Sequence, residues 1–402
     1  MKSRRETLLG IALLPVVIAL YTWTTWQFFT RPLPGGNDFL THYGAWQAYL
    51  RDGDNPYSDA AALNTQRAIY GRPALPGEDQ NRMVYPFYSI VIHGPFVLIA
   101  DYPLARALYM TLLQVALFAG VILCLRLLHW QPPTGLVAFV LIWSLLYYHD
   151  ARGIIIGQFA ILAFGALAAT LFLLQRQHDL DAGALLTLIT IKPTLVFLVV
   201  PFLLLWGSAR RRWHFVGGFL ATLALLVVGS FIVLPTWFGD WLYRLTQYAE
   251  YTHNQSPVWT IALMGSTITI IYVGGLVLLL LWSWWRALRA DDGAEFFWTL
   301  GITLVVSNLI SPRTATTDYV LMLVPTLAWF AALDRVPRWG RAALIALMLI
   351  SLIGLWWLHL ATVQGDWEQS VMYLPWPLAL GVVWVVGRRW LLDKFANLSN
   401  PN

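Results

Sequence analysis

Lys192 is the first residue of this sequence whose type and surroundings could do chemistry. It is one of only three lysines, and the other two lie close to the ends of the chain. Apolar runs, 182–191 and 193–206, flank it, and Pro193 breaks a helix at this point. An ammonium at such a break can hold an anion such as a phosphate. The alternative is one continuous apolar helix from which the lysine reaches a polar boundary.

Asp38 is the second such residue. It follows a Gly-Gly-Asn turn, where its carboxylate could cap the next helix. A carboxylate held at a fixed position can also act as a general base and remove a proton from an attacking hydroxyl. Position alone leaves the two roles equally open.

The composition places these residues in a membrane protein. Hydrophobic residues make up 58% of the 402-residue chain and charged residues 12%, against about 45–50% and 25% in soluble domains. Apolar runs of about twenty residues recur along the chain, and this length spans a bilayer core of about 30 Å. The net charge of +5 reflects arginines in short loops, so it does not predict a nucleic-acid partner. Membrane lipids are the predicted surroundings.

Short loops rich in arginine mark the cytoplasmic side, as at Arg210–Arg212 and Arg388–Arg389. The first run follows a basic N-terminus and is too long for a cleaved signal peptide, so we expect it to remain as a helix. We predict an all-α integral membrane protein of one polytopic domain, residues 1–402, in the cytoplasmic membrane, with both termini cytoplasmic. The pattern predicts about twelve spans: 8–29, 104–128, 135–149, 157–175, 182–191, 193–206, 214–235, 262–285, 295–311, 318–333, 342–360 and 373–390.

Residues 30–103 form a long segment that we expect outside the cell. Phe39, Tyr43, Trp46 and Leu50 recur at helical spacing, which predicts an amphipathic helix lying on the membrane surface. The apolar stretch 86–100 fits best as an interfacial or re-entrant helix. Counting it as a span would move every later arginine-rich loop to the outer side of the membrane. Loops of this length are usually functional.

Several short motifs follow one another along the chain in an order typical of one enzyme family. They are Asp38-Phe39 with Tyr43-Gly44-Ala45, Gly53–Tyr57, Tyr85-Pro86 with Pro95, Gly157-Gln158, Ala182-Gly183, Lys192-Pro193, Asn254–Ser256, and Ser311-Pro312 ahead of Asp318-Tyr319. Over most of its length the chain resembles glycosyltransferase family 87, in the GT-C superfamily. The resemblance implies a GT-C-like fold and a sugar donor carried on a polyprenyl phosphate, with a hexose such as mannose.

The resemblance also implies roles for individual residues. It favours Asp38 as the general base of an inverting displacement on the outer face of the membrane. Lys192 is the first candidate to hold the lipid phosphate, Arg313 the second and Arg152 the third. Contact with lipid headgroups would also explain both arginines, and it is the preferred interpretation for Arg152. Candidates to bind the sugar or the acceptor are His42, Tyr43, Gln158, Asn254, Gln255 and Asp318. After Ser311-Pro312 the chain departs from many relatives, which carry an aromatic or histidine-containing stretch there.

No cofactor is expected, because the lipid-linked sugar is a substrate. The histidines lack metal-ligand spacing, so we predict no metal. Walker, Rossmann and Ser/His/Asp motifs are absent from the sequence, which argues against a nucleotide-sugar enzyme of the soluble type. The acceptor is predicted to be a glycolipid, a glycan or a protein. The main alternative interpretation is a transporter or lipid flippase, which would explain the helices and Lys192 but not the long outside segment.

Overall fold

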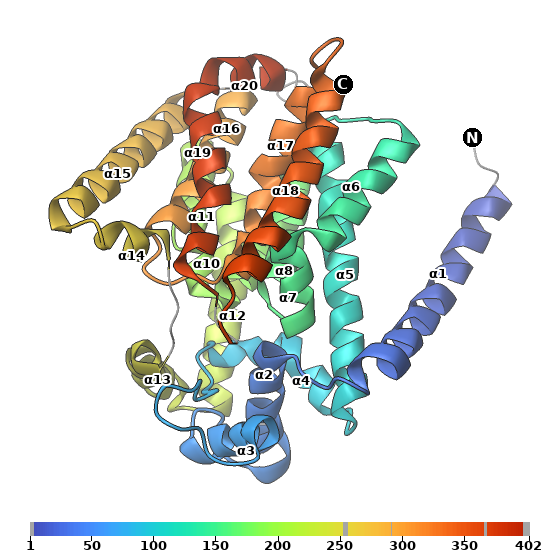
Figure 1. The fold of residues 1–402 in the computed structure, drawn as a ribbon, viewed down its shortest axis with the longest axis vertical. Coiled ribbons are helices and arrows are strands. Elements are labelled where there is room, and N and C mark those ends of the chain that lie inside the picture. Colours follow the sequence, from blue (N-terminus) through green and yellow to red (C-terminus); the bar gives the residue numbers. More distant parts are fainter. Residues whose placement is uncertain (1–3, 252–255, 291, 366–367, 397–402) are drawn as a thin grey trace. The chain divides into compact units, whose positions relative to one another are not determined.

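A computed structural model describes residues 4–251, 256–290, 292–365 and 368–396 of the chain (Figure 1). Of its residues 79% are helical, and its described part contains no strand. This confirms the predicted all-α class. The chain divides into two compact units: residues 1–115, 154–158 and 230–252 form the first, and 116–153, 159–229 and 253–402 form the second. Whether the chain acts as one domain stays a prediction.

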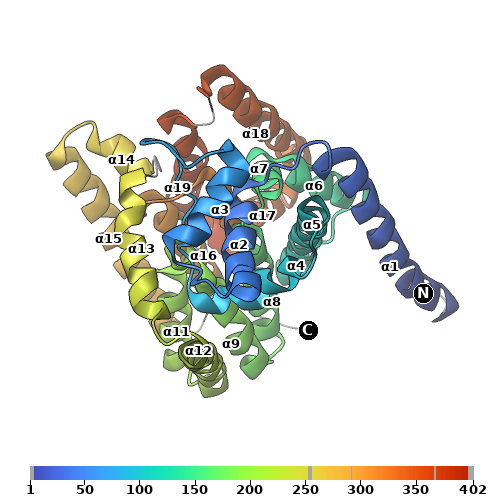
Figure 2. The same ribbon diagram turned by 90° about the horizontal axis from the view of Figure 1, so that it is seen from below.

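The first unit contains the long segment that follows the first helix. Its elements are α1 (Arg4–Thr25), α2 (Asn37–Gln47), α3 (Asp59–Tyr70), α4 (Ile90–Val97), the first half of α5 (Tyr102–Leu127) and α13 (Trp237–Tyr251). Helix α2 packs against both α3 and α4, and Figure 2 shows the three together. Helix α4 has eight residues, with a 3-10 turn before it. That is too short for a span, and the re-entrant placement stays a prediction.

The second unit contains most of the apolar helices. They are α6 (Thr134–Leu146), α7 (Tyr148–Ile156, whose end belongs to the first unit), α8 (Ala160–Gln175), α9 (Asp179–Leu188), α10 (Pro193–Val196), α11 (Val199–Ala209), α12 (Trp213–Val233, whose end belongs to the first unit), α14 (Pro257–Ala262), α15 (Ser266–Arg289), α16 (Gly293–Ile310), α17 (Leu323–Asp334), α18 (Gly340–Thr362), α19 (Pro375–Val386) and α20 (Arg388–Phe395).

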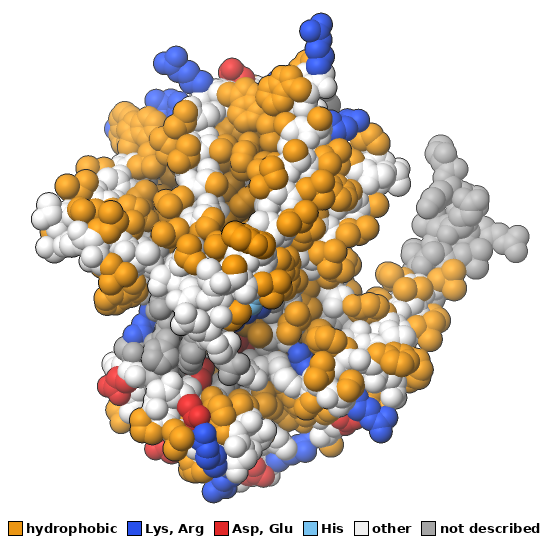
Figure 3. All heavy atoms as spheres, in the orientation of Figure 1, with side chains coloured by type: hydrophobic (Ala, Val, Ile, Leu, Met, Phe, Trp, Pro, Cys, Tyr) orange, Lys and Arg blue, Asp and Glu red, His pale blue; other side chains and the backbone are white. Residues whose placement is uncertain are grey.

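Burial separates core helices from lipid-facing ones in the second unit. Helix α16 is almost wholly buried against α15, α19 and α20. Its polar side chains Thr303, Ser307 and Asn308 bond to backbone carbonyls one turn earlier, which satisfies them inside the core. Helices α15 and α18 instead expose most of their apolar side chains. Figure 3 shows such side chains covering the visible surface of α18 and α19. A bilayer can cover a surface of this kind.

The described residues contain six helices that are long and apolar enough to cross a membrane, or eight if each of two bent pairs forms one span. The protein is therefore a multi-pass membrane protein. Each of the twelve predicted segments overlaps at least one helix, but several of these helices have about ten residues, and the count of twelve is not confirmed. Helices α6 and α7 form a pair bent by 55°. Helix α6 matches the predicted span 135–149, whereas most of α7 lies in the segment 149–158 that was expected outside.

Candidate active site

Asp38 lies in the first turn of α2, where the positive end of the helix dipole favours negative charge. The N-cap position is held by Gly36, whose φ of 77° is in the left-handed region and which carries no side chain that could cap the helix. The capping role considered for Asp38 is therefore wrong. Its carboxylate, which is half-buried, accepts a hydrogen bond at Oδ2 from the side-chain amide of Gln158, at 2.7 Å.

The turn before α2 is fixed by two side chains from α5. Arg106 donates to the carbonyls of Leu33 and Pro34, at 2.6 and 2.9 Å, and the Tyr102 hydroxyl donates to the carbonyl of Gly35 at 2.7 Å. A Cβ at Gly36 would overlap the Arg106 side chain. Glycine is thus required at this position both by the backbone angle and by the arginine. The hydrogen bonds fix where α2 begins, and with it the position of the carboxylate.

The partner of Asp38 is positioned by a second glycine. Gly157 has a φ of 79° and follows α7, and a Cβ there would overlap the Cβ of Phe39 on α2. This close approach brings the buried amide of Gln158 to Asp38. The other end of the amide, Oε1, accepts a hydrogen bond from the Tyr85 hydroxyl at 3.2 Å. Because both ends of the amide are engaged, its orientation is set, and the NH₂ group faces the carboxylate.

A group of stacked rings continues from Tyr85. The His42 ring lies 4.2 Å from the Tyr85 ring and 4.4 Å from the His93 ring, between centroids. The Tyr109 hydroxyl lies 3.4 Å from Nε2 of His93. Three predicted site residues, Asp38, His42 and Gln158, therefore meet in one cluster. The sequence interpretation missed His93 and Tyr109 and used Tyr85 only as a family motif; a histidine inside the apolar stretch 86–100 was the signal that could have found them.

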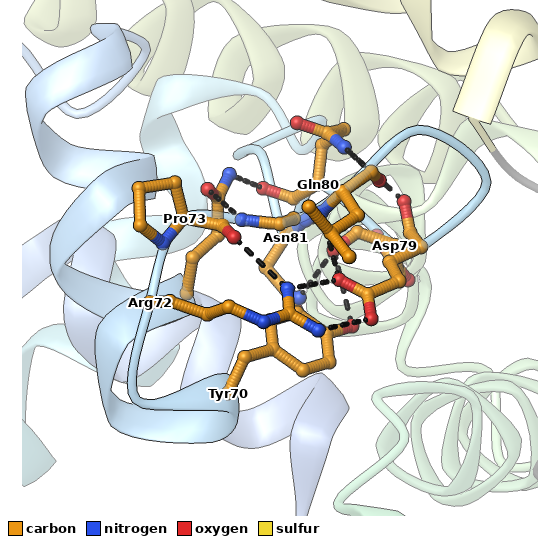
Figure 4. Close-up of polar contacts among 10 residues, drawn as sticks. Tyr70, Arg72, Pro73, Asp79, Gln80 and Asn81 are labelled. Atoms are coloured by element: carbon orange, nitrogen blue, oxygen red, sulfur yellow. Dashed lines mark hydrogen bonds and ion pairs between the residues drawn. The ribbon is translucent and has the colours of Figure 1, made fainter.

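The loop from α3 to Tyr85 is held by its own polar contacts (Figure 4). Arg72 donates to both carboxylate oxygens of Glu78, at 2.7 and 2.8 Å, and the hydrogen bond from Arg72 lowers the pKa of Glu78 to about 2. The Asn81 amide donates to the Asp79 carbonyl at 2.9 Å and accepts from Thr41 of α2 at 2.9 Å. The loop thereby connects α3 to α2.

The aromatic residues of the predicted stripe are buried in the protein and do not lie on the membrane surface, which corrects the prediction for them, whereas Leu50, its fourth residue, is exposed. Phe39 and Trp46 are fully buried and Tyr43 is 3% exposed. The Phe39 ring stacks on Tyr109 at 4.4 Å, and Tyr43 donates its hydroxyl to the Ile99 carbonyl at 2.7 Å. The stripe is the contact of α2 with the rest of the first unit.

In the second unit, the helix breaks at Lys192 as predicted. Helix α9 gives way to a 3-10 turn, Ile189–Ile191, and α10 begins at Pro193. The interpretation as one continuous helix is therefore wrong. The Lys192 ammonium lies 2.6 Å from Oδ1 of Asp318, and the two side chains are 13% and 2% exposed.

Asp318 holds the Lys192 ammonium from a turn that its own carboxylate closes. Its second oxygen, Oδ2, accepts from the Ala315 amide at 3.1 Å and from the Thr314 hydroxyl at 3.4 Å. Arg313 belongs to the same turn, and its backbone carbonyl accepts from Ser311 at 2.6 Å. The three predicted residues Lys192, Arg313 and Asp318 thus come from one region of the second unit. Asn254 and Gln255 lie outside the described residues.

A model of glycosyltransferase family 87 matches residues 84–312, more than half of the chain. The chain belongs to glycosyltransferase family 87. It is therefore an enzyme, a glycosyltransferase with membrane-spanning helices, and this favours glycosyl transfer over the transporter interpretation. No curated protein and no solved structure matches it. The match includes Gln158 and Lys192, whereas Asp38, Arg313 and Asp318 lie outside it; the roles of all these residues stay predictions.

Arg152 is engaged within the protein, and its contact with lipid headgroups stays a prediction. It forms an ion pair with Glu368, whose carboxylate also accepts from the Tyr148 hydroxyl and, at 2.5 Å, from the Thr316 hydroxyl. Glu368 was missed in the sequence because a lone carboxylate in a loop resembles a solvated charge. Among the described residues no group of histidine, cysteine and carboxylate side chains could hold a metal. The expected absence of metal and cofactor stays a prediction.

Proposed function

We propose that this family 87 enzyme transfers a hexose, such as mannose, from a polyprenyl-phosphate donor to an acceptor hydroxyl, with inversion at the anomeric carbon. The observation that carries the proposal is the Asp38 carboxylate, which is fixed at a helix start and oriented by the Gln158 amide at 2.7 Å. A carboxylate held in this way is what direct displacement requires of a general base.

In the proposed step, the acceptor hydroxyl oxygen attacks the anomeric carbon of the donor. Its proton passes to Oδ1 of the Asp38 carboxylate, while Gln158 keeps the other oxygen, Oδ2, in place. The bond from the anomeric carbon to the phosphate oxygen breaks, and the electron pair leaves on the polyprenyl phosphate. His42, in the same cluster, would contact the sugar or the acceptor; Asn254, Gln255 and Asp318 are further candidates for that contact.

The leaving phosphate gains negative charge and needs cationic groups that are already in place. We assign this role to Lys192, with Arg313 as the second cation. An ammonium has three donors, so Lys192 can keep its bond to Asp318 and still donate to a phosphate oxygen. Asp318 then limits where the ammonium can point. No metal ion or cofactor is part of this scheme.

The same proposal places the protein in the cytoplasmic membrane with a GT-C-like arrangement of about twelve spans. Both termini would be cytoplasmic, and the active site would open on the outer face, where segment 30–103 lies. The acceptor would be a glycolipid, a glycan or a protein reached from that side, and membrane lipids would surround the helices. Nucleic acid is not an expected partner.

The test is glycosyl transfer by the purified protein in nanodiscs, with a panel of polyprenyl-phosphate sugars and a total lipid extract as acceptor. Asp38→Asn keeps the shape of the side chain and its hydrogen bond from Gln158 but removes the base, so turnover should fall by about 10²-fold or more. Lys192→Ala should also lose turnover. Asp101→Asn is the matched control, because Asp101 is an exposed carboxylate at the start of α5 in the same unit.

Transfer that Asp38→Asn leaves at the wild-type rate would refute the base while leaving the family assignment intact. If no donor in the panel is consumed, both with chelator and with added divalent ions, the donor class is wrong. Counterflow of a lipid-linked sugar in liposomes would then test the transporter alternative.

A further inference from the structure

The first unit contains a cavity that the proposed reaction does not use. It has a volume of about 520 Å³ and is lined by the turn before α2, one face of α2, the facing side of α3 and the start of α5. This volume lies within the range of about 300–1,000 Å³ that is typical of small-molecule sites. All of its lining residues belong to the same unit.

The cavity lies on a different face of α2 from the general base. Asn37, Leu40, Gly44 and Gln47 line it, and their spacing of three and four residues places them on one side of the helix. Asp38 is turned about 100° away from Asn37 around the helix axis, because an α-helix has 3.6 residues per turn. The cavity lining and the Asp38 carboxylate therefore begin at the same helical turn but lie on different sides of α2.

The side chains around the cavity suit a neutral ligand that carries several hydroxyl groups. Three amides, Asn37, Gln47 and Asn64, and the carboxylate of Asp52 line it. Amides both donate and accept, which matches the hydroxyls of a sugar. None of the lining residues is Lys, Arg or His, so a phosphate or another anion would meet no cationic side chain in the lining.

Apolar surface makes up the larger part of the cavity lining, and it includes two aromatic rings whose positions are fixed. The Tyr43 and Tyr102 hydroxyls donate to backbone carbonyls, at 2.7 Å each, which sets the positions of their rings. Aromatic rings of this kind can contact the apolar face of a sugar. An acyl chain would instead have to displace water from three amides and a carboxylate without replacing their hydrogen bonds, which costs free energy.

The cavity is built on a rigid base, since α2 and α3 approach closely. A Cβ at Gly44 would overlap the Thr65 side chain. Ser58 caps α3 by accepting from the Ala61 amide at 3.1 Å, and Gln66 of α3 donates to the Gln80 carbonyl at 2.7 Å. A site that keeps its shape loses little conformational entropy when a ligand binds.

We propose that this cavity is a carbohydrate subsite, which binds sugar units of the acceptor that are remote from the reacting hydroxyl. The inference rests on the proposed function, because it takes Asp38 as the point of transfer. Beyond that function, the cavity indicates that the acceptor is an oligosaccharide or carries one. Tyr43, expected from the sequence to bind sugar, would do so here and not beside Asp38.

The experiment measures binding separately from transfer. Neutral oligosaccharides of one to four hexose units are titrated onto the full-length protein in nanodiscs, without donor, and saturation-transfer NMR reports binding. Ala68→Phe introduces a ring into the cavity, and Asn64→Ala removes one amide with little effect on folding. Ala60→Phe is the matched control, because Ala60 is also exposed on α3 but does not line the cavity.

Oligosaccharides should bind the wild type, and Asn64→Ala should weaken binding by about threefold or more. Ala68→Phe should weaken it further, whereas Ala60→Phe and Asp38→Asn should bind as the wild type does. In transfer assays, Ala68→Phe should raise KM for long acceptors and leave kcat for short ones unchanged. The proposal is overturned if no oligosaccharide binds the wild type, or if Ala68→Phe and Asn64→Ala bind normally. A lipid that copurifies with the wild type and is lost only from Ala68→Phe would also overturn it. Loss of transfer in Asp38→Asn without loss of binding separates the two proposals.

Discussion

Replacement of Gln158 by leucine should slow transfer without unfolding the protein. The side chain keeps a similar length, but Asp38 loses the amide that donates to Oδ2 at 2.7 Å, and the Tyr85 hydroxyl loses its acceptor. Gln158 is a positioning residue in this scheme, because it acts on the acceptor only through the carboxylate. The variant therefore tests whether the orientation of Asp38 matters.

The magnitude follows from the kind of hydrogen bond. A bond to a charged group contributes about 1.5–3 kcal/mol, and 1.36 kcal/mol corresponds to a tenfold change in rate. If the bond is needed to hold the base in the transition state, kcat should fall by about 10- to 150-fold in Gln158→Leu. Tyr85→Phe removes the neutral bond on the far side of the amide, at 3.2 Å, and leaves the amide's bond to the carboxylate in place. Its effect should be smaller, at about two- to tenfold.

The pH profile distinguishes orientation of the base from general damage to the fold. Gln158→Glu places a second carboxyl group beside Asp38, and two carboxylates that share a site hold a proton more tightly than one does. The acid limb of the kcat profile should move to higher pH in Gln158→Glu and stay in place in Tyr85→Phe. The assay is single-turnover transfer from a fixed donor across pH 4–9, with melting temperatures of all variants in parallel.

Two results would refute this reasoning. A kcat for Gln158→Leu within twofold of wild type would mean that the bond has no part in the reaction. An acid limb that stays in place in Gln158→Glu would mean that Asp38 is not the group whose ionisation controls the rate.

Three further predictions concern stability. Gly157→Ala should destabilise the protein by several kcal/mol, because φ is positive and the added Cβ overlaps α2; thermal unfolding checks this, and a melting temperature equal to wild type contradicts it. Lys192→Met should be destabilising by about 3–5 kcal/mol, since it leaves the Asp318 carboxylate buried without its ion-pair partner. Adding Asp318→Leu should restore the melting temperature but not transfer, and recovery of both would refute a phosphate-binding role. Glu78 has its pKa lowered from 4.5 to about 2 by the hydrogen bond from Arg72, so its stabilisation of the loop is complete above about pH 5 and is lost as the pH falls towards 2. Hydrogen exchange of residues 71–82 should show this loss in wild type but not in Glu78→Gln, and equal profiles would contradict it.

The break at Lys192 could be predicted because it depends on local chemistry. A proline inside an apolar run lacks an N–H donor and kinks or breaks a helix, and here α10 begins at Pro193. The partner of Lys192 could not be predicted, since Asp318 lies 126 residues further along the chain. The same holds for Asp38 and Gln158, which are 120 residues apart. Resemblance to a family selected both residues, but only the fold shows that they touch.

The stripe on α2 was assigned to the wrong surroundings for a physical reason. Spacing shows that one face of a helix is apolar, but it does not show whether lipid or protein covers that face. Phe39 and Trp46 are fully buried in protein contacts. The number of spans was uncertain for a related reason, because helices such as α9, with ten residues, are shorter than the bilayer core. Hydropathy alone cannot separate a short span from a buried helix.

The four side chains assigned to the base, its positioning and the leaving phosphate lie at or near the ends of helices. Asp38 is in the first turn of α2, Gln158 follows α7, Lys192 precedes α10, and Arg313 follows α16. In a membrane, backbone can leave the helical path only where protein or a water-filled space satisfies its polar groups. Breaks in the helices are therefore the places where polar side chains can be held in fixed directions. In this chain Gly36, Gly157 and Pro193 stand where helices begin or end beside the proposed site residues. Many other charged residues, such as Arg212 with Asp179, instead form ion pairs within the structure.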